Sequence, residues 1–198
     1  MIAKTSGDKN ILPAMNRINV VGTSGSGKTM FSRKLAELLE YPYIEMDKIF
    51  WGPNWYWPSD DEFFDKLRAA LKEPKWVLDG NYTRTIPIKW ESADTVIWLD
   101  YSFTTTLFQA LGRAFKRSIT REELWEGTGN RESFKKSFLS KDSIILWTLK
   151  THGPVKKKYE SYMIDKNFSN IRFIRLKNHK EADAFLSEVK QKRGTVES

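Results

Sequence analysis

Eight consecutive residues have the types and spacing needed to hold a nucleoside triphosphate. They fit the P-loop pattern G-x-x-x-x-G-K-[ST] at every fixed position. The glycines allow backbone N–H groups to converge on phosphate oxygens, Lys28 can reach the β- and γ-phosphates, and the Thr29 hydroxyl suits Mg²⁺. We therefore expect ATP and Mg²⁺ at a nucleotide-binding set made of Gly22, Thr23, Ser24, Gly25, Ser26, Gly27, Lys28, Thr29 and Met30.

The flanking segments supply the strand and the helix that such a loop requires. Residues 17–21 are an apolar run typical of a short buried strand, and residues 28–39 place Phe31, Leu35 and Leu38 on one helical face. The N-terminus of this helix would add its dipole and its free N–H groups to the phosphate site. A glycine- and serine-rich turn without a ligand is the alternative, and the strand–loop–helix context disfavours it.

Two aspartates follow predicted strands, and parallel strands bring their carboxyl ends to one edge of a sheet. Asp79 is expected to hold Mg²⁺ together with Thr29, although an Asp79-Gly80 pair is also a common turn. Asp47 could accept the proton of an acceptor hydroxyl or bind an amine or a sugar hydroxyl. It could equally cap the short helical segment that follows it.

Four arginines predict a lid that closes over the phosphates. Two of them lie four residues apart on one helical face, and two lie in a polar stretch that contains glycines. Guanidinium groups on a closing lid suit the charge that develops in phosphoryl transfer. An exposed basic helix end is the alternative. The expected catalytic set is Lys28, Asp47, Arg113, Arg117, Arg121 and Arg131.

An aromatic connection after Asp47 is the expected place for the acceptor. Its rings between residues 50 and 57 could stack on a base or a sugar, or could pin the loop to the core, and both interpretations stay open. His179 follows the fifth strand and could lie near the nucleotide base, with surface packing as the alternative. The expected acceptor-binding set is Asp47, Trp51, Asn81, Tyr82 and Arg84.

Strand-like and helix-like segments alternate along the chain, which predicts an α/β fold with a parallel sheet. Residues 1–16 are expected to be a flexible tail, and residues 17–192 one domain with an acceptor-binding region at about 47–72 and a lid at about 113–135. The expected strands are 17–21, 43–46, 76–78, 95–99 and 171–176, and the expected helices are 28–39, 59–73, one from 103, 134–150 and one after 180.

Composition narrows the class of protein. A chain of 198 residues can bury a sizeable core, and the absence of cysteine excludes disulfides and thiolate metal sites. No apolar run has the length of a membrane span, so we expect a cytoplasmic protein, either a monomer or a homodimer. The net charge of +8 fits either nucleic acid or phosphate ligands, and the P-loop favours phosphates. The run Lys156–Lys158 is expected to be a solvated helix face.

Five further segments carry a resemblance to a known family: 76–85 (WVLDGNYTRT), 93–100 (ADTVIWLD), 121–125 (REELW), 130–133 (NRES) and 142–147 (DSIILW). They resemble the adenylate-kinase-like P-loop proteins often labelled DNA topology modulation, or FlaR-like, proteins. The resemblance covers roughly residues 17–190. It implies the three-layer fold of nucleoside monophosphate kinases, with a five-stranded parallel sheet in the order 2-3-1-4-5 and a helical lid.

Two functions from different classes remain. The first is ATP- and Mg²⁺-dependent phosphoryl transfer to a small molecule. Asp47 after the second strand is similar to kinases that phosphorylate a hydroxyl, such as shikimate or nucleoside kinases. The second is a nucleotide-dependent regulator that binds DNA through its positive surface and does little chemistry. The sequence favours the first, because the arginines gather in a lid-like segment and not along a recognition helix.

Overall fold

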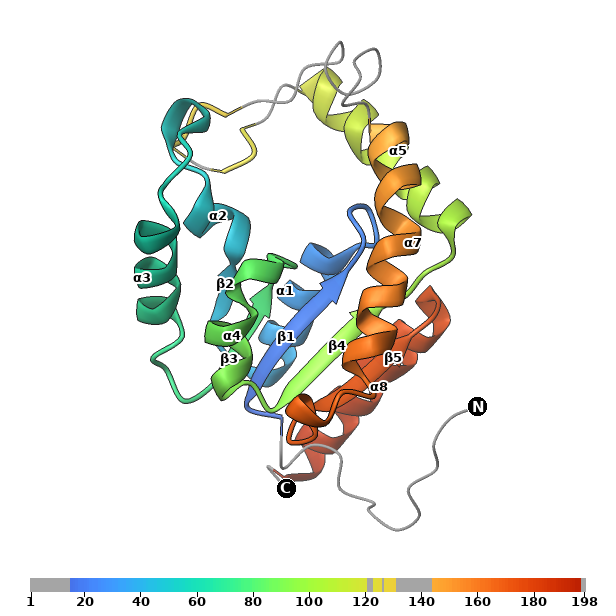
Figure 1. Ribbon diagram of the computed structural model, residues 1–198. Helices are drawn as coiled ribbons and strands as arrows, with labels where there is room; N and C mark the ends of the chain where they lie inside the picture. Colours follow the sequence, from blue (N-terminus) through green and yellow to red (C-terminus); the bar gives the residue numbers. More distant parts are fainter. Residues whose placement is uncertain (1–14, 121–122, 126, 131–143, 197–198) are drawn as a thin grey trace.

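The protein forms a five-stranded parallel sheet between two layers of helices, and the computed structural model describes residues 15–120, 123–125, 127–130 and 144–196 (Figure 1). All strand pairs are parallel, and the order β2-β3-β1-β4-β5 confirms the expected order. The strands are β1 (Arg17–Gly22), β2 (Tyr43–Glu45), β3 (Trp76–Asp79), β4 (Thr95–Leu99) and β5 (Arg172–Leu176).

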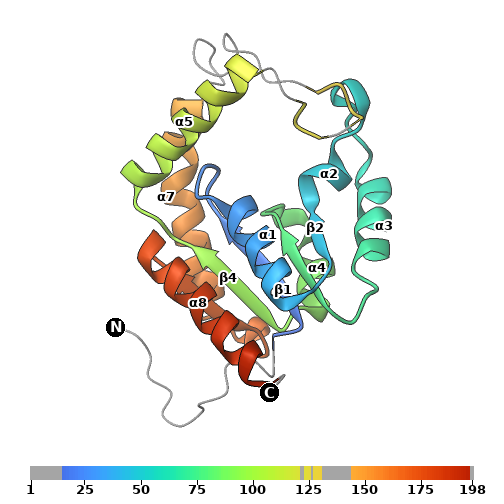
Figure 2. The same ribbon diagram turned by 180° about the vertical axis from the view of Figure 1, so that it is seen from behind.

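Seven α-helices occur in the described ranges and cover both faces of the sheet. Helices α1 and α8 pack on one face (Figure 2), and α3, α4 and α7 lie over the other. None of these helices is both long and apolar enough to cross a membrane. Their bounds are α1 (Lys28–Leu39), α2 (Met46–Phe50), α3 (Asp60–Ala70), α4 (Ile86–Ser92), α5 (Phe103–Thr120), α7 (Ile144–Tyr162) and α8 (His179–Val196).

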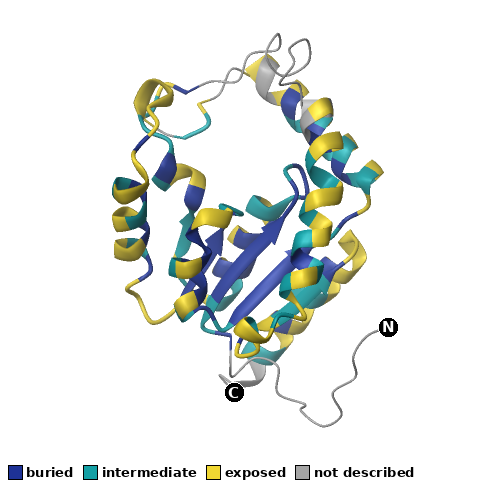
Figure 3. Cartoon of the chain, viewed as in Figure 1, coloured by how far each residue is buried: buried dark blue, intermediate teal, exposed yellow. Residues whose placement is uncertain are grey.

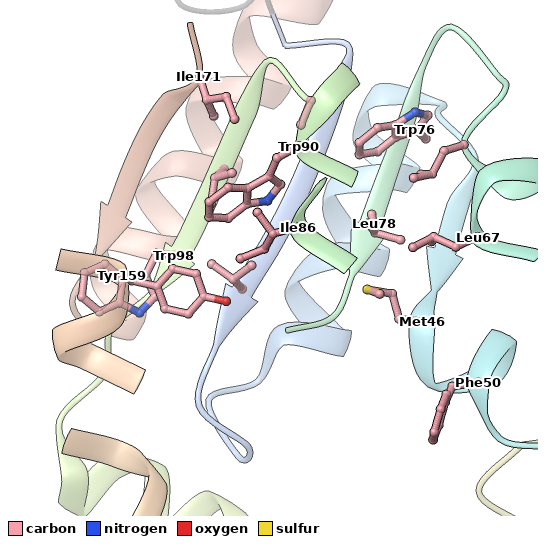
Figure 4. Close-up of a cluster of buried hydrophobic side chains, with 14 of the residues drawn as sticks. Met46, Phe50, Leu67, Trp76, Leu78, Ile86, Trp90, Trp98, Tyr159 and Ile171 are labelled. Carbon is pink, nitrogen blue, oxygen red and sulfur yellow. The ribbon is translucent and has the colours of Figure 1, made fainter. Parts of the chain in front are cut away.

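Strand side chains alternate between two apolar clusters, so the central strands β1, β3 and β4 are almost entirely buried, and the edge strands β2 and β5 are partly exposed (Figure 3). In β4, for example, Ile97 and Leu99 join the cluster under α1 and α8. Val96 and Trp98 join the opposite cluster, where Trp98 packs on Tyr159 of α7 (Figure 4). Burial on both faces explains the near-continuous apolar runs that identify these strands in the sequence.

Helix α7 differs from the helix expected at residues 134–150, since it continues to Tyr162. Residues 134–143 lie outside the described residues. Pro154 lies inside α7, although proline lacks a backbone donor and usually terminates a helix. Here the turns that follow Pro154 are held by tertiary packing: Tyr159 contacts Trp98 and Tyr162 contacts Trp90.

The strand register brings the carboxyl ends of β1, β2 and β3 together. Val20 is paired with Asp79, and Asp79 with Glu45. The loop after β1, the α2 helix after β2 and the loop after β3 therefore begin at one edge of the sheet. This edge is the place where the open α/β sheet can bind ligands.

Candidate active site

The P-loop connects β1 directly to α1. Gly27 precedes the helix with φ 85°, a left-handed conformation that favours glycine, and no side chain of the described residues caps this helix start. The first N–H groups of α1 are therefore available to a ligand. The Ser26 hydroxyl is buried and has no hydrogen-bond partner within the described structure. Orphaned donors gathered in a glycine-rich turn fit a bound phosphate chain.

Gly25 shows how closely the loop packs on α5. A Cβ atom at this position would lie 2.8 Å from the Thr106 carbonyl oxygen and 2.8 Å from the Ala110 Cβ. Only glycine allows this approach, since φ at Gly25 is also 90°. Helix α5 thereby forms one wall beside the phosphate loop.

The Lys28 side chain reaches back across the loop, where its Nζ donates to the Thr23 carbonyl oxygen at 3.2 Å. Burial lowers the pKa of Lys28, the nearby Asp79 carboxylate opposes this shift, and the Arg113 guanidinium adds to it. With one backbone acceptor among the described residues, the buried Lys28 ammonium is only partly compensated for its loss of water. Anionic phosphates are the ligands that would compensate it.

Thr29 and Asp79 meet as the sequence predicts: the Thr29 hydroxyl donates to Asp79 Oδ2 at 2.7 Å. Tyr43 donates to the same oxygen at 3.3 Å. Burial raises the pKa of the Asp79 carboxyl, and the Lys28 charge and the Thr29 hydrogen bond oppose the rise. A hydroxyl and one carboxylate are oxygen donors of the kind Mg²⁺ prefers when phosphates and waters complete its shell, so these residues fit that ion.

Asn81 fastens the loop after β3 to the end of β1. Its Oδ1 accepts from the Gly22 N–H at 3.0 Å, and its Nδ2 donates to the Gly22 carbonyl oxygen. The Tyr159 hydroxyl of α7 also donates to Asn81 Oδ1, at 3.3 Å. Asn81 therefore contacts protein groups on both sides and positions the P-loop relative to α7.

Asp47 lies in the first turn of α2 and is exposed. The Tyr82 hydroxyl donates to its Oδ1 at 2.7 Å, which holds the carboxylate in place, and no other described residue hydrogen-bonds to this carboxylate. Burial raises the pKa of Tyr82, with the Asp47 charge as a second cause, so Tyr82 remains a hydrogen-bond donor at neutral pH. The N-terminal residue of α2 is Met46, and the residue before it is Glu45, so Asp47 is not the helix cap.

A cleft of about 540 Å³ joins these groups, a volume typical of small-ligand sites. Eight of the residues expected at the site line it, from the nucleotide, catalytic and acceptor sets together. They are Ser24, Lys28, Thr29, Asp47, Asp79, Asn81, Tyr82 and Arg113. Glu45, Trp55, Gly80, Thr83, Leu124, Trp125, Thr151, Val155 and Lys158 complete the lining.

Four residues expected at the site lie elsewhere. Met30 is 68% exposed and is not among the lining residues. His179 begins α8, where it packs on Tyr101 and shares a hydrogen bond with Gln109. The Arg84 guanidinium pairs with Asp60 and lies over the rings of Phe50, Trp57 and Phe63. Trp51 contacts Trp55, Trp57 and Trp125 and supports the wall of the cleft from behind.

Of the four lid arginines, the structure places Arg113. Its Nη2 donates to Ser24 Oγ of the P-loop at 3.2 Å, so a guanidinium reaches the phosphate loop from α5. Arg121 and Arg131 lie outside the described residues, and nothing is described of the Arg117 side chain.

The segment after α5 contacts the aromatic loop, which sequence reasoning missed. Buried Asn130 donates to the Gly52 carbonyl oxygen at 3.0 Å and accepts from the Trp55 N–H at 2.7 Å. The Trp125 ring stacks on Trp51, and its Nε1 donates to Glu45 at 3.3 Å. Residues 123–125 and 127–130 therefore lie beside residues 51–57 (Figure 1), and we call these two segments the arch; Trp55, Leu124 and Trp125 of the arch line the cleft. The sequence carries little signal of this contact, since tryptophan is abundant in residues 51–57 but occurs once, as Trp125, in residues 121–143.

The sheet order, the P-loop between β1 and α1 and the helices on both faces define a P-loop kinase fold. No family model matches the chain, and no curated protein matches it either, so membership of the DNA topology modulation family is not confirmed.

Among solved structures, the chain is similar to a gluconokinase from Sinorhizobium meliloti 1021, with a TM-score of 0.48 and 16% identity over 93% of this chain and 99% of that one. It is also similar to the shikimate kinase from Acinetobacter baumannii in complex with shikimate, with a TM-score of 0.48 and 17% identity over 91% and 94% of the two chains. At these values the assignment of the site depends on the residues of this chain alone.

Proposed function

We propose that the protein is an ATP- and Mg²⁺-dependent phosphotransferase that phosphorylates a hydroxyl group of a small molecule. The observation that carries the proposal is the composition of the cleft. Phosphate-binding groups, with Lys28 and Thr29 among them, share one cavity with a carboxylate, Asp47, that is held by Tyr82 and has no second hydrogen-bond partner among the described residues. A carboxylate can also activate water, so stimulation of ADP formation by an acceptor is what distinguishes transfer to a hydroxyl from hydrolysis.

The proposed roles follow from the contacts. Lys28, the loop N–H groups and Arg113 bind the triphosphate, and Thr29 and Asp79 hold Mg²⁺, which would screen the charge of the β- and γ-phosphates. Asp47 orients the acceptor hydroxyl and takes its proton. The acceptor oxygen then bonds to the γ-phosphorus while the bond to the β–γ bridging oxygen breaks and ADP leaves.

Acceptor-stimulated ADP formation, measured over a panel of nucleosides, nucleotides and small hydroxy compounds, tests the proposal. In Asp47→Asn the amide oxygen can still accept from Tyr82, but the group can no longer take a proton. We expect kcat to fall by about 10²- to 10⁴-fold with the KM for ATP unchanged. Asp183→Asn removes an exposed carboxylate of α8 that does not line the cleft, so it is the matched control.

The proposal fails if no acceptor raises ADP formation while ATP still raises the Tm of the protein. The rival function, nucleotide-dependent DNA binding, has the net charge of +8 in its favour. It predicts duplex binding that weakens steeply with salt, which a filter-binding titration at several salt concentrations measures.

A further inference from the structure

Helix α7 presents a short polar and apolar stripe to the cleft. Thr151, Val155 and Lys158 are spaced by four and three residues, which places them on one helical face, and all three line the cavity. Lys156 and Lys157 are exposed, as expected for a solvated run. Lys158 differs from its neighbours, because it is half-buried and turned inward.

The Lys158 ammonium has one hydroxyl partner and no carboxylate partner among the described residues. Its Nζ donates to Thr83 Oγ1 at 2.8 Å and lies 5.3 Å from the centre of the Tyr159 ring. Burial lowers the pKa of Lys158, and no nearby carboxylate opposes this shift. An ammonium has three donors, so two remain for another ligand.

A second amine, that of Lys89, lies close to Lys158. Lys89 of α4 is fully buried, and its Nζ donates to the Gly80 carbonyl oxygen at 3.1 Å. Burial lowers the pKa of Lys89, and the charge of Lys158 contributes to this shift. No carboxylate of the described chain pairs with either amine. The loop from Gly80 to Thr83 therefore has two amines and no counter-charge on this side.

A positive and a negative side chain lie on opposite sides of the acceptor half of the cleft. Lys158 comes from α7 and Asp47 from α2, and these two helices stand on opposite sides of the opening (Figure 1). Both side chains contact the loop after β3, Asp47 through Tyr82 and Lys158 through Thr83. Lys158 contacts no P-loop residue in the described structure, so its charge belongs to the acceptor half.

We propose that Lys158 and Thr83 form an anion-binding subsite, so that the acceptor is a hydroxy compound that also carries a carboxylate or a phosphate. This inference rests on the proposed phosphotransferase function. Two ammonium donors of Lys158 and the Thr83 hydroxyl would bind the anion in charge-assisted hydrogen bonds. A neutral acceptor would cover the ammonium without neutralising it, and that desolvation cost would discriminate against it.

Matched acceptors test the subsite. ADP formation is measured with glycerol, glycerate and glycerol 3-phosphate, with ribose, ribonate and ribose 5-phosphate, and with adenosine and AMP. We expect the anionic members to react and the neutral ones to have a kcat/KM at least tenfold lower. The carboxylate and phosphate members of each set distinguish the two anion types.

Variants assign the effect to one side chain. Lys158→Met should raise the KM for the anionic acceptor at least tenfold with kcat nearly unchanged, and Lys158→Arg should restore much of the affinity. Lys157→Met, the exposed neighbour, should behave as wild type. The subsite is wrong, and the phosphotransferase function stands, if neutral and anionic acceptors react equally or if Lys158→Met leaves the KM unchanged.

A binding measurement separates this failure from failure of the proposed function. If none of the compounds stimulates ADP formation, the Tm is measured with ADP and Mg²⁺ present, with and without each anionic compound. A rise in wild type that is absent in Lys158→Met supports the subsite without turnover. No rise, or an equal rise in both proteins, overturns it.

Discussion

At the scale of single residues, Lys28 combines burial with charge. Its pKa is lowered because the side chain is withdrawn from water, and its direct partner among the described residues is the Thr23 carbonyl oxygen. A buried ammonium lowers the stability of the ligand-free protein, and bound anionic phosphates would offset this cost. Stability and ligand binding therefore make opposite demands on this position.

Lys28→Met distinguishes the effect of Lys28 on stability from its effect on ATP binding. Methionine keeps most of the side-chain volume without the charge, so we expect a Tm equal to or above that of wild type. ATP should no longer raise the Tm, and turnover should fall at least about 100-fold, since the amine binds charge that develops in the transition state. Differential scanning fluorimetry with and without ATP measures both effects. Lys34→Met, at an exposed position of α1, is the control; an undiminished ATP response in Lys28→Met would contradict the assignment.

At the scale of elements, the arch joins two segments that the sequence presents as separate regions. Asn130 makes both side-chain hydrogen bonds to the aromatic loop, and the Asn54 N–H donates to the Thr128 carbonyl oxygen at 3.0 Å. Asn54 and Trp55 have φ values of 55° and 60°, a left-handed backbone that needs support in residues other than glycine. The arch supplies that support.

Asn130→Ala should therefore loosen the arch. The Gly52 carbonyl and the Trp55 N–H would lose their partner, which we expect to lower the free energy of unfolding by about 1–3 kcal/mol. The KM for the acceptor should rise more than the KM for ATP, because Trp55 lines the acceptor half of the cleft. Urea denaturation and steady-state kinetics measure the two effects.

Asn130→Asp refines the test, since its carboxylate can still accept from the Trp55 N–H but cannot donate to Gly52. It should be at least as unstable as Asn130→Ala at neutral pH, because it buries a charge next to the Gly52 carbonyl oxygen. Unchanged stability and KM values in both variants would show that the arch does not position the aromatic loop.

At the scale of the whole molecule, the buried Lys89 amine couples folding to pH. Burial and the charge of Lys158 lower the pKa of Lys89 to about 7 in the folded protein, against its ordinary value of 10.5. Between these values the unfolded chain holds a proton that the native protein does not. The free energy of unfolding contributed by Lys89 therefore rises with pH over this window, by at most ~1.4 kcal/mol per pH unit. Below pH 7 both states are protonated and the penalty is full.

Lys89→Met should remove this dependence. In urea denaturation at pH values from 6 to 10, the free energy of unfolding of the variant should exceed that of wild type most at pH 6. The difference should shrink as pH rises. Lys157→Met, at an exposed position, should follow the wild-type curve. A constant difference across the series would show that Lys89 titrates normally in the folded protein.

Local sequence patterns predicted much of the candidate site. The spacing of Gly22, Gly27, Lys28 and Thr29 predicts the phosphate loop because that geometry is made by neighbouring residues. Asp47 and Asp79 could be placed at the same edge because parallel strands end together, and the structure brings both into the cleft. The order of the sheet followed from a family resemblance and is confirmed.

Other site features had no local signal. The sequence placed Lys158 on a solvated helix face, whereas in the structure it lines the cleft, because the packing of α7 against the sheet sets which face points inward. Arg84 follows Asp79 closely in the chain, yet its guanidinium turns to Asp60 and to aromatic rings, and such a choice among partners depends on side chains distant in sequence.

By itself, therefore, the sequence determined the fold class, the phosphate loop and the carboxylates at the strand ends. These depend on hydrogen bonds and periodicities within a few residues. Only the tertiary structure decided which side chains complete the cleft, because Trp125 and Lys158 enter it from segments far along the chain and Asn130 holds the loop that carries Trp55. Contacts between such segments depend on the packing of α7 and of the arch, and neither is encoded in any local pattern.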